Sequence, residues 1–197
     1  RVWASLLRLG AGFGIAVVLG TLLGLLASAN AFARQSLRAF VTVLQAIPSI
    51  AWVPLFLILL GFGNIPMIVV VAVAAFFPST LSAVNASESV PASYLAAARV
   101  MGASRRQLLR RVLLPAVTPE LLTGAQLAFG NAWRALISAE MLIGFGQGIG
   151  RSLAYSGEIA DMSGVLANIV VIAVLAALID QVALERLKRR LLRYRYV

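Results

Sequence analysis

The sequence predicts an all-α, polytopic membrane protein, built as a single transmembrane domain over residues 1–197. Two observations on composition predict this class, since 61% of the residues are apolar and only 12% are charged. A soluble domain is about half apolar and about a quarter charged, so this chain has too little charge to cover a surface that faces water. The third observation is length, because several apolar stretches reach the roughly 20 helical residues that cross a bilayer.

Five apolar stretches are long enough to be spans. The first contains five glycines, and small residues let helices approach closely in a membrane, where packing drives association. The second contains Pro48 and Pro54, and the third contains Pro78, which predicts kinks whose freed carbonyls are satisfied by neighbouring groups. We expect the spans at about 9–33, 40–60, 66–86, 117–139 and 164–183.

The segment 88–115, between the third and fourth spans, is too polar to cross a membrane but is rich in helix-forming residues. Gly102 can end a first short helix as the residue after its C-cap. Ser104 followed by Gln107 is typical of a capping box, which starts a second helix. The segment is therefore predicted to leave the membrane as a helix–turn–helix that carries five arginines.

Basic residues cluster between the spans. Thirteen of the 17 lie on one side of the predicted topology, three (Arg1, Arg8 and Arg151) lie on the other, and Arg134 falls within a span. This is the positive-inside pattern of a membrane protein, so the net charge of +10 does not indicate a nucleic-acid partner. Arg1 then lies outside, and we expect a further span before it, six in all. The cytoplasmic basic residues are Arg34, Arg38, five in 88–115 and six in the tail 186–195.

The residue types that support chemistry are scarce. The chain has no cysteine and no histidine, which excludes disulfides and thiolate metal sites and removes the commonest general base and metal ligand. Its single lysine, Lys188, lies in the tail and belongs to no phosphate-binding loop. We expect no catalytic residue and no metal site. An intramembrane enzyme and an ion-coupled secondary transporter both need carboxylates that the middle of the spans hardly offers.

The segment 96–115 contains a recognisable motif. Three alanines, a three-residue spacer and a glycine are followed, nine residues later, by Val-Leu-Leu-Pro. This arrangement resembles the EAA motif of ABC importer permeases, with Val112 in place of isoleucine and Ala96 in place of the glutamate. The missing glutamate removes one charge-assisted contact that the family has. The residues that the resemblance assigns to coupling with an ATPase are Ala96, Ala97, Ala98, Arg99, Gly102, Leu114 and Pro115.

Other stretches resemble the nitrate, sulfonate and taurine branch of the same permeases. They are 45–55, with its two prolines, 61–63, 139–141 and the glycine-rich 144–150, so the similarity covers essentially the whole chain. The resemblance implies the type I ABC importer permease fold, with 88–115 as the cytoplasmic coupling loop, in a bacterial inner membrane. If the chain were a scaffolding membrane protein, there would be no explanation for this motif.

The resemblance also implies partners. They are cytoplasmic ABC ATPase subunits, which carry ATP and magnesium, a second copy of the permease, and a periplasmic or lipid-anchored solute-binding protein. The permease itself binds no cofactor. The implied solute is a small anion such as nitrate, a sulfonate, taurine or bicarbonate, and a heterocyclic or thiamine-precursor solute is the alternative. Membrane lipids are a further partner, because the arginines of the coupling loop can also hold phospholipid head groups.

Arg134 lies late in the fourth span, where an ionisable residue is costly and often functional. Gln126 and Arg134 share a helical face, which either lines a polar route for an anion or leaves Arg134 to reach the head groups or a neighbouring carboxylate. The prolines of the second span and their neighbours either line this route or serve ordinary packing. The candidate path residues are Gln45, Pro48, Ser49, Trp52, Gln126, Arg134 and Glu140.

Two carboxylates leave alternatives open. Glu140 follows the fourth span, where it caps the adjoining loop, pairs with Arg134 or Arg151, or contacts the solute. Asp180, near the inner end of the last span, is expected to pair with cytoplasmic arginines, and a proton relay is the alternative. The loop 144–150 between these carboxylates is expected outside, as a surface for the binding protein or as a plain turn.

Overall fold

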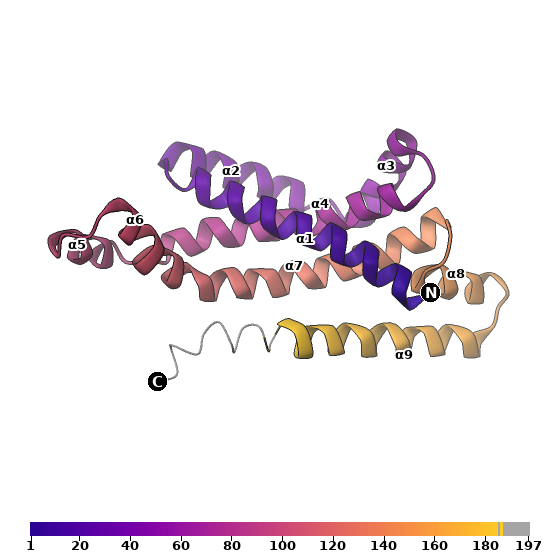
Figure 1. Ribbon diagram of the computed structural model, residues 1–197. Helices are drawn as coiled ribbons and strands as arrows, with labels where there is room; N and C mark the ends of the chain where they lie inside the picture. Colours follow the sequence, from indigo (N-terminus) through magenta and orange to yellow (C-terminus); the bar gives the residue numbers. More distant parts are fainter. Residues whose placement is uncertain (185, 187–197) are drawn as a thin grey trace.

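Three long helices, α1 (Val2–Ala27), α4 (Asn64–Glu88) and α7 (Leu114–Ile143), form the centre of the computed structural model, which describes residues 1–184 and 186. Helix α4 packs against both α1 and α7. Figure 1 shows the long helices α1, α4, α7 and α9 running along roughly one common direction, with the N-terminus and α8 at one end and α5 and α6 at the other. The predicted all-helical class is confirmed for the described residues, and the expected basic tail lies largely outside them.

Glycines set the distance between α1 and α4. A Cβ atom on Gly12 would lie 2.7 Å from the Ile68 carbonyl oxygen, and one on Gly24 would lie 2.6 Å from the Ala83 Cβ. Neither position has room for a side chain, so the two backbones meet directly, as the glycine-rich first span predicts. Gly10 and Gly14, in contrast, face open space.

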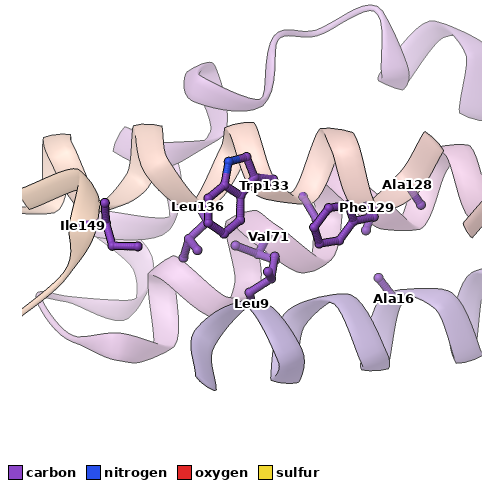
Figure 2. Close-up of a cluster of buried hydrophobic side chains, with 10 residues drawn as sticks. Leu9, Ala16, Val71, Ala128, Phe129, Trp133, Leu136 and Ile149 are labelled. Carbon is purple, nitrogen blue, oxygen red and sulfur yellow. The ribbon is translucent and has the colours of Figure 1, made fainter. Parts of the chain in front are cut away.

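Aromatic and aliphatic side chains fill the centre between α1, α4 and α7. Leu9 and Val71 lie beside Trp133 and Leu136, as Figure 2 shows. The Phe129 ring stacks on the Trp133 ring with centroids 6.4 Å apart. In lipid such contacts stabilise the bundle by close packing rather than by exclusion of water, because the lipid tails are as apolar as these side chains.

The second expected span, 40–60, contains a sharp break at one of the two prolines for which a kink was predicted. The chain forms α2 (Ala31–Gln45), the 3₁₀ turn η1 (Ser49–Ala51) and α3 (Trp52–Leu60), and the two limbs meet at 80°. The break falls at Pro48, because a proline disfavours helical backbone in the residue before it and donates no hydrogen bond. Pro54 causes no break, since it lies in the first turn of α3, where amides have no partner within the helix.

The other spans differ from expectation mainly at their ends. Helix α1 begins at Val2 rather than at 9 and ends at Ala27 rather than at 33, while α4 extends the expected 66–86 by two residues at each end. Helix α9 (Met162–Leu178) continues into η3 (Ile179–Leu184), close to the expected 164–183. The described residues contain four helices that are long and apolar enough to cross a membrane, or five spans if the bent pair counts as one.

The expected helix–turn–helix between α4 and α7 is confirmed. Helix α5 (Ala92–Val100) ends before Gly102, whose φ is +81°, and the amides of Gly102 and Ala103 donate to the carbonyls of Arg99 and Ala98. This is the Schellman arrangement that glycine favours. The second helix is α6 (Arg105–Gln107), which continues through η2 (Leu108–Leu113) into α7.

A capping box starts α6, as predicted. The Ser104 amide donates to the Gln107 side chain over 2.8 Å, and the Gln107 amide donates to the Ser104 hydroxyl over 3.3 Å. Two amides that the helix leaves without partners are thereby satisfied.

The segment 144–162, expected as a loop, contains the helix α8 (Ile149–Glu158). Asp161 then caps α9, since its carboxylate accepts hydrogen bonds from the Ser163 hydroxyl and the Gly164 amide. These two donors hold the pKa of Asp161 below its usual range. The run of glycines before Ile149 suggested a turn throughout, but the ten residues after Gly148 are helical.

Candidate functional site

A cavity of about 200 Å³ lies at the break between α2 and α3. Gln45, Pro48, Ser49 and Trp52 line it from the broken helix. Ala74 and Phe77 of α4 and Asn131 and Arg134 of α7 complete the wall. The tertiary structure therefore brings together four of the expected path residues and the expected arginine, although Arg134 is more than 80 residues from them in the sequence.

Arg134 is exposed, and it lines the cavity at the broken helix. Its Nη2 atom donates to the Asn131 Oδ1 atom one turn earlier on α7, and no carboxylate of the described residues forms an ion pair with it. The arginines at 8, 34, 38 and 151 all pair with glutamates. Arg134 therefore offers the cavity a positive charge that described carboxylates leave uncompensated.

The face that carries Gln126 and Arg134 borders a second hollow, of about 550 Å³, between α7 and α9. Gly130, Trp133 and Asp180 line it as well. Gln126 thus shares a face with Arg134, as expected, but lines this hollow and not the cavity at the broken helix. No ion pair joins Asp180 to an arginine of the described residues, and most of the basic tail, which holds part of the cytoplasmic arginines expected to pair with it, lies outside them.

Glu140 does not line either space. It is buried, with 1% of its surface exposed, and its Oε1 atom accepts from Arg8 Nη1 over 2.6 Å. The expected pairing of Glu140 with Arg134 or Arg151 is wrong. Arg8 of α1 forms the ion pair with Glu140 instead, and Arg151 pairs with Glu158 at 3.6 Å. The expected capping of the adjoining loop is confirmed, since Glu140 Oε2 accepts the Gly150 amide over 3.0 Å.

Ser5 and Asn64 complete this buried polar cluster. The Ser5 hydroxyl donates to Glu140 over 2.8 Å and accepts from the Ile149 amide over 3.0 Å, and Arg8 Nε donates to Asn64 Oδ1 over 2.9 Å. Sequence reasoning missed both Ser5 and Arg8. One signal was available, because both lie on the buried face of α1 together with Gly12, Ala16, Gly20 and Gly24.

The coupling segment, residues 88–115, which are expected to couple to an ATPase, lies at the opposite end of the bundle (Figure 1). Ala96, Ala97 and Arg99 of α5 are exposed, and so are Val100 and Met101, with 88% and 85% of their surfaces accessible. Leu114 and Pro115 lie where η2 becomes α7, and Pro115 lines a hollow of about 670 Å³ between α5 and α7. The segment therefore presents small and apolar side chains outward, beyond the bundle, on α5, which the turn at Gly102 separates from the helix that continues through α6 and η2 into α7.

Comparison with known proteins identifies the class. Residues 16–192 match the family model described as binding-protein-dependent transport system inner membrane component, so the chain belongs to this family. It is similar to the nitrate import permease protein of Synechocystis (32% identity, 92% of this chain and 66% of the relative) and to the taurine transport system permease protein of Escherichia coli (35%, 95% and 68%). A Bacillus subtilis protein named for aliphatic sulfonate transport is 32% identical over 97% of this chain.

The chain is thus an ABC importer permease of the nitrate, sulfonate and taurine branch, as the sequence motifs predict. It spans about two thirds of the length of the relatives that it matches. Inward-facing structures of the MetNI methionine ABC transporter share its fold, with TM-scores of 0.78 and 0.80, at 24% and 25% identity over 96% of this chain. Permease subunits of this family are not enzymes in themselves, and the family is that of integral membrane proteins.

Proposed function

We propose that this chain forms the translocation pathway of an ATP-driven importer for a small anionic solute. The observation that carries the proposal is the cavity at the break between α2 and α3, into which Arg134 brings an uncompensated positive charge. The relatives named for nitrate, taurine and sulfonate transport support an anionic solute, because all three names denote compounds with an anionic group.

The geometry of the cavity supports a path for an ion. Irregular backbone at membrane depth is stable only where it is buried in protein or lines a polar space, and transporters use such broken helices to hold solutes. The break at 46–48 is of this kind, and Gln45, Ser49 and Asn131 add polar groups around Arg134. Trp52 and Phe77 form an apolar wall that can contact the uncharged part of a solute.

In this proposal, the coupling segment links the ATPase to movement of the membrane-spanning helices. We expect Ala96, Ala97 and Ala98 to allow close approach of α5 to a groove on a cytoplasmic ATPase, which alone binds ATP and magnesium. Because η2 and α7 are continuous, a movement at Leu114 is transmitted along the helix to Arg134, about 30 Å away at 1.5 Å per residue. Two such permeases, two ATPases and an external binding protein would alternate between inward-facing and outward-facing states.

Uptake by the reconstituted transporter tests this proposal. The permease, in its full length, is placed in liposomes with its ATPase and binding protein, and entry of labelled taurine, nitrate and an alkyl sulfonate is measured with and without ATP. We expect ATP-dependent entry of at least one anion. Transport of a neutral or cationic solute with no anion transported would overturn the anionic assignment, and entry without ATP would overturn the coupling.

A second candidate solute is a heterocycle or thiamine precursor. It is favoured by Trp52, which lines the cavity and whose ring stacks on Phe56 with centroids 6.1 Å apart, so that an aromatic surface is available beside Arg134. Competition by a pyrimidine against the labelled anion in the same liposomes separates the two candidates.

A further inference from the structure

A mainly apolar cavity of about 450 Å³ lies at the end of the bundle that carries the coupling segment. The ends of α1, α2 and α4 meet α5, η2 and α7 around it. Its wall is formed chiefly by leucines, among them Leu22, Leu25, Leu26, Leu95, Leu109 and Leu113. It is separate from the cavity at the broken helix, with which it shares no lining residue.

A positive charge borders this apolar space. Arg34 lines the cavity, and its Nε atom lies 3.0 Å from the Glu88 Oε1 atom. Arg38 pairs with the other oxygen of the same carboxylate and also donates to Asn85 over 2.9 Å. Two guanidinium groups thus share one carboxylate, which leaves one positive charge in excess.

We propose that this cavity binds an acyl chain of an anionic phospholipid from the cytoplasmic leaflet, with the phosphate held by Arg34 and Arg38. An apolar cavity does not retain water, because water there finds no hydrogen-bond partners, whereas a chain of methylenes restores the missing contacts. Arginines at the cytoplasmic surface attract anionic lipids in particular. The apolar wall matches the acyl chain of such a lipid, and the arginines at its edge match the phosphate.

A lipid bound in this cavity lies where the coupling segment meets the membrane-spanning helices. Leu95 belongs to α5, Leu113 precedes α7, and Leu25 belongs to α1, so a bound chain touches the three parts that must move relative to one another. The lipid would therefore fill the space between α5 and the bundle and transmit force from one to the other. This inference is independent of which solute the transporter carries.

Photo-crosslinking locates the lipid without any mutation. The full-length transporter is reconstituted with phosphatidylglycerol that carries a diazirine on its acyl chain, and the labelled peptides are mapped by mass spectrometry. We expect labelling to concentrate in 22–29 and 109–117, and phosphatidylcholine with the same diazirine to label these peptides several-fold less. Equal labelling by the two lipids, or labelling of the outer surface of the spans alone, would overturn the proposal.

A cavity-filling variant tests occupancy. Leu25→Trp fills the space, whereas Leu23→Trp places the same side chain on the same helix at a position that does not line it. By native mass spectrometry we expect retained phosphatidylglycerol to fall several-fold in L25W and to be unchanged in L23W. Retention in L25W at the wild-type level contradicts the proposal. Inorganic phosphate, added to the wild type that retains phosphatidylglycerol, is expected not to displace the lipid, and displacement would show that the arginines bind free phosphate instead.

Discussion

Arg8 of α1 and Glu140 of α7 form an ion pair of 2.6 Å between Nη1 and Oε1, with only 6% and 1% of the two residues exposed. The pair joins residues that are 132 apart in the sequence. Both charges are costly in a membrane when they stand alone, so each is stable there mainly because the other is present. The pair fixes the N-terminal end of α1 to α7 and, through Ser5 and the Gly150 amide, to the start of α8.

Removal of one partner is therefore expected to destabilise the fold strongly. Glu140→Gln leaves Arg8 buried without a counter-charge, and we expect a loss of about 3–5 kcal/mol, as for other broken buried pairs. Arg8→Gln should have a similar effect. The measurement is thermal or denaturant unfolding of the purified protein in detergent. The double variant is expected to lose clearly less than the sum of the two single losses; simple additivity would show that the two charges do not interact.

Gly148→Ala is expected to disturb the same cluster from the loop. A Cβ atom at Gly148 would lie 2.5 Å from the carboxylate carbon of Glu140, closer than atoms can approach, so the loop or the carboxylate must move. Gly157→Ala in α8 is the matched control, because nothing lies within 4 Å of its added Cβ. We expect G148A to unfold at a lower temperature than wild type, and G157A to be stabilised by about 0.5–1 kcal/mol. Equal behaviour of the two variants would refute this account of the loop.

Gly102→Val is expected to disturb the coupling segment alone. The φ of +81° suits glycine, is tolerated by asparagine and is strained for a β-branched residue, and no atom lies within 4 Å of an added Cβ. The strain of about 1–2 kcal/mol should therefore come from the backbone alone. We expect G102V to insert into the membrane normally but to lose association with the ATPase in co-purification. G102N is expected to keep most of that association, and full association and transport in G102V would sink the proposed coupling role.

Arg134→Gln is expected to reduce anion uptake about tenfold to a hundredfold, because a hydrogen bond to a charged group contributes about 1.5–3 kcal/mol. Arg134→Lys keeps the charge and should retain part of the activity. Arg151→Gln removes an arginine that pairs with Glu158 and does not line the cavity, so it serves as the control. The measurement is initial uptake in liposomes, with co-purification of the ATPase as a check on assembly. Undiminished uptake by R134Q would remove Arg134 from the pathway.

Local signals predicted several parts of this structure well. The Schellman turn at Gly102 and the capping box of Ser104 and Gln107 are present as expected, since both depend on residues within five positions of one another. The prolines show where local reasoning stops. Pro48 separates two limbs at 80°, whereas Pro78 and Pro119 lie inside α4 and α7. Proline removes one hydrogen bond in every case, and the surrounding helices decide whether the chain bends or continues.

The amino-acid sequence by itself determined the membrane class, four of the five spans to within several residues, and membership of the permease family. These properties depend on composition, on the length of apolar stretches and on a motif of fixed spacing. Only the tertiary structure decided which arginine neutralises Glu140 and which side chains surround Arg134. Long-range pairs of this kind follow from how α1, α4 and α7 pack, and a helix pattern shows which face is buried but not which residue of another helix it will meet.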